Sequence, residues 1–377
     1  MDFERMPSVS RRERSGEATI RIGALAPLTR PGWVQAGRHL LAGLEFAVSE
    51  VTGAGGVAGR PLELVVRDTA ADPKKAVAAV DELARLGVVA LAGEYHSVVA
   101  RAAAARADEL GIPFLCSSAV LDRLTERPTK WVARLAPPQS RGWQIYADFL
   151  SRAGHRRIAV ASQQSVYWAS GAHILRDHVH SRGGSLAEIG MSSLDPSSLC
   201  DQLIDHRATV VLLLVGHPEP AISIVKSVRN DSRLATIQIG APAGQPEFAE
   251  WGTLLGEDSA AIPFLRYRPE HFNALGSYVE RALREKLGEA PSFVALEGYD
   301  TIVVLADAMR SHGIERNSIA EWWPHTRVDG TRGKIQFFRT PGTTIWQWTG
   351  APIQIVERTP GNPAQIRTLY NVADPNG

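Results

Sequence analysis

The chain has 377 residues, of which 44% are hydrophobic and 21% charged, and its formal net charge is +1. This length is enough for two domains. The near-neutral charge gives no electrostatic reason to expect nucleic acid or an anionic membrane as a partner. The two cysteines, Cys116 and Cys200, are too few for a disulfide framework and lie in or beside hydrophobic runs, where buried free thiols are common.

The first 18 residues are charged and contain no hydrophobic stretch of signal-peptide length. We therefore expect residues 1–18 to be a mobile leader and the protein as written to be cytoplasmic. No later segment reaches the roughly 18 to 20 consecutive apolar residues of a membrane-spanning helix, so membrane insertion is not expected.

From residue 20 onward, short hydrophobic runs alternate with longer amphipathic ones, which indicates strands that alternate with helices. The first unit is predicted to have strands at 20–26, 62–66, 88–92, 112–116 and 131–135, and helices at 35–51, 73–86 and 98–110. The pattern restarts after Pro137-Pro138, with strands at 157–161, 209–215 and 236–240, and helices at 140–153, 169–182, 197–205 and 219–229. Two such units predict an α/β fold with two lobes, each a mostly parallel sheet flanked by helices.

The last part of the chain is predicted to have helices at 270–287 and 293–311, followed by strand-like segments such as GKIQFF and TTIWQW. Neither unit alone accounts for these helices, so we expect this part to cross between the lobes. Residues 19–139 and 263–343 are assigned to the first lobe, and residues 140–262 and 344–377 to the second. A cleft between two lobes is a common site for a small ligand.

The segment Val51–Arg60, VTGAGGVAGR, has the spacing G-x-G-x-x-A of a dinucleotide-binding loop. Such a loop needs a strand before it and a helix after it, so that backbone amides face the pyrophosphate. Here a predicted helix precedes the glycines and a predicted strand follows them. We therefore interpret the segment as a turn that ends the first helix, and we expect no cofactor.

A family resemblance is carried by IGALAPLTRPG at 22–32 and by AGLEFAVSEVTGAGGVAGRPLELVVRDTAADPKKAV at 42–77. These runs resemble the N-terminal lobe of the type I periplasmic binding proteins of the branched-chain amino acid (Leu/Ile/Val) family, which includes a cytoplasmic amide sensor. The resemblance continues through GEYHS, LAPPQS, TVVLLLVG, LEGYDTIVVLADAM and GKIQFF. It implies a two-lobed fold that holds a small-molecule ligand between the lobes, at loops on the carboxyl ends of the strands.

On the first lobe, the resemblance implies ligand contacts in two loops. After the first strand, Ala36 stands where the family places an aromatic residue, and Trp33 either fills that space or packs on a neighbouring loop. In GEYHS, Ser97 corresponds to a hydroxyl that binds the ligand carboxylate, and Tyr95 to a contact in the amide sensor, with His96 between them. The alternative for Ser97 is that it only caps the following helix.

The loop after strand 112–116 departs from the family pattern, because Val120 replaces a threonine whose hydroxyl binds the ligand. Ser117 and Ser118 could supply that hydroxyl, next to Ala119. A larger departure occurs in the loop Gly240–Gly244, GAPAG, which contains Ala241. In this loop the amino acid binders have a glutamate that pairs with the ligand ammonium. This loss disfavours a standard amino acid unless another carboxylate replaces the glutamate, and the sequence offers Glu94 or Glu297 for that role.

On the second lobe, Tyr167 and Trp168 correspond to a tyrosine that stacks on the ligand, and His217 follows strand 209–215 at another contact loop. A single histidine is also common as a core or surface residue. Glu297 starts the motif LEGYD, which the resemblance places at a helix facing the cleft; the alternative is a solvated helix residue.

The sequence contains no nucleophile elbow, zinc-protease motif, metal-binding Cys/His spacing or Walker A loop, so catalysis is not indicated. Two functions fit the resemblance. One is the solute-binding component of an ABC importer, periplasmic or lipid-anchored, with its permease as partner and an export signal that this start lacks. The other is a cytoplasmic ligand sensor with a regulatory protein as partner. The expected ligand is an amide, an aromatic acid or another small carboxylic acid.

Overall fold

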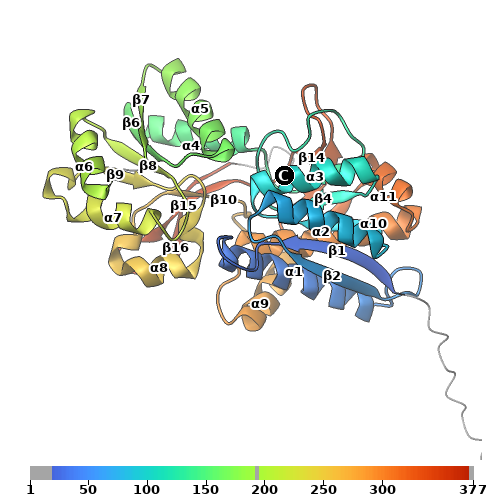
Figure 1. Ribbon diagram of the computed structural model, residues 1–377. Coiled ribbons are helices and arrows are strands. Elements are labelled where there is room, and N and C mark those ends of the chain that lie inside the picture. Colours follow the sequence, from blue (N-terminus) through green and yellow to red (C-terminus); the bar gives the residue numbers. More distant parts are fainter. Residues whose placement is uncertain (1–18, 192–194, 373–377) are drawn as a thin grey trace, which may run out of the picture.

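The computed structural model describes residues 19–191 and 195–372 as two lobes, each built on a mostly parallel sheet with helices on its faces (Figure 1). The leader expected at residues 1–18 lies outside the described residues. Both cysteines are buried free thiols, as expected. The two-lobed α/β fold predicted from the sequence is confirmed.

The first lobe contains a seven-stranded sheet with the order β13-β14-β5-β4-β3-β1-β2. All its neighbouring strands are parallel except β13 and β14. Its strands are β1 (Ile20–Ala26), β2 (Leu62–Asp68), β3 (Ala90–Gly93), β4 (Phe114–Cys116), β5 (Val132–Arg134), β13 (Phe337–Phe338) and β14 (Trp346–Trp348). Its helices are α1 (Val34–Gly53), α2 (Pro73–Arg85), α3 (Ser97–Leu110), α9 (Ala274–Leu287), α10 (Phe293–His312) and α11 (Arg316–Trp322), and a hairpin is formed by β11 (Val328–Gly330) and β12 (Gly333–Ile335).

Both faces of this sheet are covered, which explains why its strands are hydrophobic throughout rather than alternating. Ile20, Ile22 and Ala24 of β1 belong to the same core as α1 and α10, whereas Leu25 packs with α2 and α3 on the other face. Helices α1 and α10 approach so closely that a Cβ added at Gly43 would lie 1.9 Å from the carbonyl oxygen of Ala295. Only glycine fits at this crossing.

The second lobe contains a four-stranded parallel sheet with the order β7-β6-β8-β9 and a three-stranded antiparallel sheet with the order β10-β15-β16. Its strands are β6 (Arg157–Ser162), β7 (Ser185–Gly190), β8 (Val210–Leu214), β9 (Gln238–Gly240), β10 (Phe264–Arg266), β15 (Gln354–Thr359) and β16 (Asn362–Asn371). Its helices are α4 (Gln139–Arg152), α5 (Val166–Ser181), α6 (Pro196–Asp205), α7 (Ala221–Asn230) and α8 (Ala249–Leu255).

The chain crosses between the lobes at 135–138, 267–273 and 349–353. The first crossing lies next to the boundary expected at 139, which stays a prediction. The other two lie later than the expected boundaries at 263 and 344, because β10 pairs with β15 in the second lobe and β14 pairs with β5 in the first. A three-residue hydrophobic strand carries no local signal of which sheet it joins.

The glycine-rich segment Val51–Arg60 is a turn, as predicted. Helix α1 ends at Gly53 and β2 begins at Leu62, and Gly55, Gly56 and Gly59 all have positive φ. At Gly56 an added Cβ would lie 2.0 Å from the carbonyl oxygen of Arg60, so the turn can close only with glycine there.

Candidate ligand-binding site

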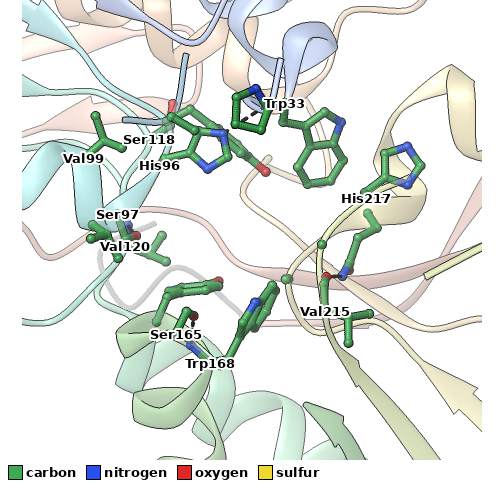
Figure 2. Close-up of a pocket in the computed structure, with 18 of the residues that line it drawn as sticks. Trp33, His96, Ser97, Val99, Ser118, Val120, Ser165, Trp168, Val215 and His217 are labelled. Atoms are coloured by element: carbon green, nitrogen blue, oxygen red, sulfur yellow. Dashed lines mark hydrogen bonds between the residues drawn. The ribbon is translucent and has the colours of Figure 1, made fainter. Parts of the chain in front are cut away.

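A cavity of about 320 Å³ lies between the lobes, where the carboxyl ends of the two parallel sheets face each other. In Figure 2, Trp33, His96, Ser97 and Ser118 of the first lobe and Trp168, Val215 and His217 of the second surround one space. The loops that follow β1, β2, β3 and β4 form one wall, and the loops that follow β6, β8 and β9 form the other.

Of the twelve site residues predicted from the sequence, eight line this cavity and four do not. The eight are Trp33, Tyr95, His96, Ser97, Ser118, Tyr167, Trp168 and His217. Their contact with a ligand remains a prediction. The eight come from five separate loops and from both lobes, so the fold brings together residues up to 184 positions apart in the sequence.

The four predicted residues that do not line the cavity are buried elsewhere, so these predictions are corrected. The Ser117 hydroxyl forms a hydrogen bond of 2.8 Å with the Thr301 hydroxyl. Ala119 and Ala241 are fully buried in the hydrophobic cores of the first and second lobes. Glu297 is fully buried and pairs with a buried arginine. Neighbouring residues on a loop point in different directions, which the sequence alone does not show.

Ser97 is held so that its hydroxyl hydrogen is free. Its Oγ accepts hydrogen bonds from the backbone N–H groups of Val120 (3.1 Å) and Leu121 (3.2 Å). A serine hydroxyl has two acceptor lone pairs and one donor hydrogen, so the hydrogen remains available. Ser97 is also the first residue of α3 rather than its cap, because His96 occupies the cap position. The hydroxyl therefore links the loop after β4 to α3 instead of capping the helix.

The start of α3 adds backbone donors to the same wall. Ser97, Val98 and Val99 all line the cavity, and the first N–H groups of a helix have no carbonyl partner within it. The N-terminal end of a helix also carries partial positive charge. Together with the Ser97 hydroxyl, these groups can bind a carboxylate or carbonyl oxygen.

Glu94 does not replace the missing ammonium partner. It is completely buried and accepts hydrogen bonds from the Thr69 hydroxyl (2.7 Å) and the backbone N–H groups of Tyr95 (2.8 Å) and His96 (2.9 Å). Burial raises its pKa to about 6. Its role is to shape the 93–97 loop, which begins at Gly93 with a φ of +112°.

Glu297 is also unavailable. Its Oε1 lies 3.1 Å from Nη1 of Arg332. The Nε of the same arginine lies 3.2 Å from Oδ2 of Asp300. Burial raises the pKa of Glu297 to about 7, while the Arg332 charge opposes this shift. The Ser118 hydroxyl is near this carboxyl but not in hydrogen-bonding geometry with it. Among the described residues, no carboxylate, lysine or arginine lines the cavity.

A family model described as Periplasmic binding protein matches residues 19–355. The chain belongs to the periplasmic binding protein family. It is 29% identical over 340 residues to a leucine-, isoleucine-, valine-, threonine- and alanine-binding protein of Pseudomonas aeruginosa, covering 88% of this chain and 90% of that protein. These matches make it a solute-binding protein of the Leu/Ile/Val type, as the motifs indicated.

Solved structures of similar fold include a leucine binding protein from Thermotoga maritima, with a TM-score of 0.82, 21% identity and coverage of 95% and 99% of the two chains. Another is an ABC transporter solute-binding protein from R. palustris in complex with benzoate, with a TM-score of 0.78, 18% identity and coverage of 95% and 98%. The type I two-lobed fold is thus shared.

Aromatic side chains from both lobes line the cavity in this solute-binding protein. Trp33 contacts Tyr95 edge to face at 5.6 Å between ring centroids, and it also reaches the second lobe, at 5.0 Å from His217 and 4.7 Å from Phe248. Trp33 thus lines the cavity and also packs on a neighbouring loop, and its contact with a ligand remains a prediction. On the second lobe, the rings of Tyr167 and Trp168 lie 4.7 Å apart.

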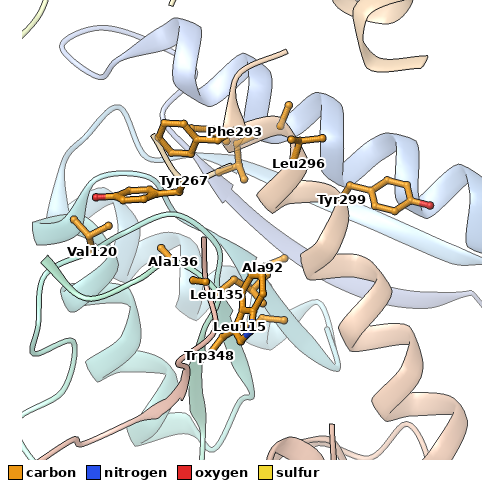
Figure 3. Close-up of a cluster of buried hydrophobic side chains, with 14 of the residues drawn as sticks. Ala92, Leu115, Val120, Leu135, Ala136, Tyr267, Phe293, Leu296, Tyr299 and Trp348 are labelled. Atoms are coloured by element: carbon orange, nitrogen blue, oxygen red, sulfur yellow. The ribbon is translucent and has the colours of Figure 1, made fainter. Parts of the chain in front are cut away.

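Three tyrosines, Tyr95, Tyr167 and Tyr267, come to the cavity from different elements. Burial raises the pKa of each hydroxyl, and the neighbouring tyrosines raise the pKa values of Tyr95 and Tyr267 further. All three are therefore neutral near neutral pH. The rings of Tyr267 and Phe293 pack with their centroids 5.1 Å apart. Both belong to a hydrophobic cluster that includes Leu115 and Trp348 (Figure 3).

The two histidines at the cavity are held in defined positions. His96 Nε2 accepts a hydrogen bond of 3.1 Å from the backbone N–H of Trp33, and burial lowers the pKa of His96 to about 4. His217 Nε2 lies 3.2 Å from Oε2 of Glu250, and burial lowers the pKa of His217 although Glu250 opposes the shift. Neutral imidazoles therefore face the ligand space.

Sequence reasoning missed several lining residues, notably Gln245, Tyr267 and Phe293. Gln245 follows the loop at Gly240–Gly244 that the family pattern singled out, so extending that loop by one residue would have found it. Tyr267 begins a lobe crossing and Phe293 is the first residue of α10, and neither carries a motif.

The described residues contain no group of three or more His, Cys, Asp or Glu side chains placed to hold a metal ion. Within the same ranges, no helix combines the length and the apolar character needed to cross a membrane.

Proposed function

We propose that this solute-binding protein captures a small organic ligand that is monoanionic or uncharged and has an aromatic or apolar body, such as an aromatic acid or an amide, for an ABC importer. The observation that carries the proposal is the lining of the cavity. It contains two tryptophans, three tyrosines and a phenylalanine but, within the described chain, no carboxylate.

The missing carboxylate argues against a standard amino acid. An ammonium group brought into this cavity would lose water without gaining a charged partner, at a cost of about 2 to 5 kcal/mol. Neither Glu94 nor Glu297 can compensate, because both are engaged behind the wall. An acid or amide group, in contrast, would meet the donors of Ser97 and the start of α3.

The aromatic rings explain how closure would select a ligand. A ring bound between Trp33 on the first lobe and Trp168 on the second would bury apolar surface on both sides only when the lobes are closed. Ligand binding would then shift the population toward the closed state by the difference in affinity between the two states. A permease that recognises the closed form would receive only the loaded protein.

The importer role is supported by the neighbour that is described as an ABC transporter solute-binding protein and was solved with benzoate. The cytoplasmic sensor role expected from the N-terminal sequence is the competing hypothesis. Cell fractionation separates them: recovery outside the cytoplasm together with the permease supports the importer, whereas recovery in the cytosol with a regulatory protein contradicts it.

Isothermal titration calorimetry with benzoate, cyclohexanecarboxylate, benzamide, L-leucine, L-phenylalanine and glycine betaine tests the ligand class. An acid or amide without an ammonium should bind at least about thirtyfold more tightly than either amino acid. Glycine betaine tests whether the aromatic rings enclose a quaternary ammonium instead. Tightest binding of L-leucine or glycine betaine would contradict the proposal.

A further inference from the structure

Four residues that line the cavity each have a fully buried side-chain atom without a hydrogen-bond partner among the described residues. Trp33 Nε1 and Ser118 Oγ belong to the first lobe, and His217 Nδ1 and Gln245 Oε1 to the second. Buried polar groups are normally paired, because an unpaired one loses its hydrogen bond to water without replacement. On the wall of a ligand cavity, such atoms indicate what the ligand must offer.

The orientation of the Gln245 amide is set by its surroundings. Its Nε2 donates to the carbonyl oxygens of Val215 (3.1 Å) and Leu213 (3.4 Å). A flipped amide would place its oxygen against two carbonyl oxygens, so the nitrogen must face them. The Oε1 of this side chain, which is 1% exposed, is therefore a fixed acceptor without a donor.

His217 presents a second acceptor on the same wall. Its Nε2 faces the Glu250 carboxylate at 3.2 Å, so Nε2 carries the proton. Burial lowers the pKa of His217, which keeps the ring neutral near neutral pH and leaves Nδ1 as an acceptor. The nearby Gly216 N–H is already paired with Gln163 Oε1 at 2.7 Å and cannot serve either atom.

The two walls therefore favour opposite kinds of hydrogen-bonding group on the ligand, an acceptor at the first lobe and a donor at the second. The first lobe offers donors at Ser97 and the start of α3, and the second lobe offers the acceptors of Gln245 and His217. Building on the proposed function, we infer that the ligand is an aromatic acid whose carboxylate lies against α3 and whose hydroxyl or amino substituent donates a hydrogen bond to Gln245 Oε1. An amino substituent has a second hydrogen, which can be donated to His217 Nδ1. Gln245 is then a residue that determines specificity.

Calorimetry on the full chain tests this inference with benzoate, 3- and 4-hydroxybenzoate, and 3- and 4-methoxybenzoate. A methoxy group keeps the oxygen but cannot donate. One hydroxybenzoate should bind about tenfold or more tightly than both benzoate and its own methoxy analogue. Gln245→Met, which removes the acceptor at similar volume, should abolish that preference.

The matched control is Gln238→Met. Gln238 lies in the same lobe and its Nε2 also donates to two carbonyl oxygens, those of Ile239 and Ala261, but it does not line the cavity. This variant should keep the preference for the hydroxyl group. The comparison of hydroxyl with methoxy in the wild type needs no variant, so it decides the question even if Gln245→Met does not fold.

The outcomes separate this inference from the proposed function. The inference is overturned if benzoate binds as tightly as both hydroxybenzoates, or if Gln245→Met still prefers the hydroxybenzoate over its methoxy analogue. In either case the proposed ligand class, an aromatic acid or amide, is not affected. If no acid binds and L-leucine does, the proposed function fails and the inference fails with it.

Discussion

The two walls of the cavity are built in different ways. The first-lobe wall contains one contiguous stretch of lining residues, Tyr95–Val99, together with residues from the loops after β1, β2 and β4, and its free hydrogen-bonding groups are mainly donors. The second-lobe wall comes from three separate loops, after β6, β8 and β9, and its two fully buried unpartnered atoms are acceptors. This difference supports a division of labour in which the first lobe anchors the acid group and the second selects the rest of the ligand.

The largest effect is expected where the first-lobe wall begins. A Cβ added at Gly93 would lie 2.0 Å from the carbonyl oxygen of Leu25, at a φ of +112°. Gly93→Ala should lower the free energy of unfolding by about 3 kcal/mol or more and abolish binding, as measured by denaturant titration and calorimetry. At Gly87, which also has positive φ, no atom lies within 4 Å of the added Cβ, so Gly87→Ala should cost only about 1 to 2 kcal/mol. Equal costs would contradict the steric explanation.

A pH series distinguishes His96, on the first-lobe wall, from Glu297, which is buried behind it. Burial raises the pKa of Glu297 to about 7, so its contribution to stability falls as pH rises from about 4.5 to 7. Burial lowers the pKa of His96 to about 4, so its contribution rises from about pH 4 to 6.5.

As pH rises from about 4.5 to 7, the free energy of unfolding of Glu297→Gln should therefore increase relative to that of the wild type. As pH rises from about 4 to 6.5, that of His96→Gln should decrease relative to the wild type. Each change is at most about 3 kcal/mol, from roughly 1.4 kcal/mol per pKa unit. Unfolding free energies measured between pH 4 and 7 check both signs. A pH dependence of the same sign in the two variants would show that burial does not control these pKa values.

The serines at the two helix starts sharpen the comparison between the walls. Ser97→Ala removes the hydroxyl that we propose to bind the ligand, and it should weaken benzoate binding about tenfold to a hundredfold. Ser165 instead caps α5 by accepting from the backbone N–H of Trp168 at 3.0 Å. Ser165→Ala should lower the free energy of unfolding by about 1 kcal/mol with a smaller effect on affinity. Calorimetry would contradict the division of labour if both variants weakened binding equally.

The smallest effect is expected at an ion pair between the lobes. Arg30 lies 3.7 Å from Glu250, and their side chains are 66% and 35% exposed. Such a pair contributes at most about 0.5 to 1 kcal/mol, so Arg30→Ala should change ligand affinity by no more than a few-fold. Trp33→Ala, which removes the ring contacts to His217 and Phe248, serves as the contrasting variant. A larger effect of Arg30→Ala would mean that charge, rather than ring packing, holds the lobes together.

Much of the fold was predictable because its strands and helices carry strong local signals. The strands β1 and β8 are hydrophobic throughout, and α2 has Asp72 as a cap with proline at its first position. The missed strands lack such signals. β7 and β16 are largely exposed edge strands, and β15 contains Glu357 and Arg358, whose charges are buried in pairs and hydrogen bonds with other segments.

By itself, the sequence determined the two-lobed α/β architecture, the turn at Val51–Arg60 and the loop that contains Tyr95 and Ser97. The reason is that hydrophobic period, helix caps and glycine turns act over short stretches of chain. Only the tertiary structure decided that β14 joins the first-lobe sheet, that Glu94 and Glu297 are buried with partners of their own and do not line the cavity, and that Gln245 Oε1 has no partner among the described residues. These outcomes depend on which distant segments meet, because the partner of a buried polar group comes from whatever packs against it.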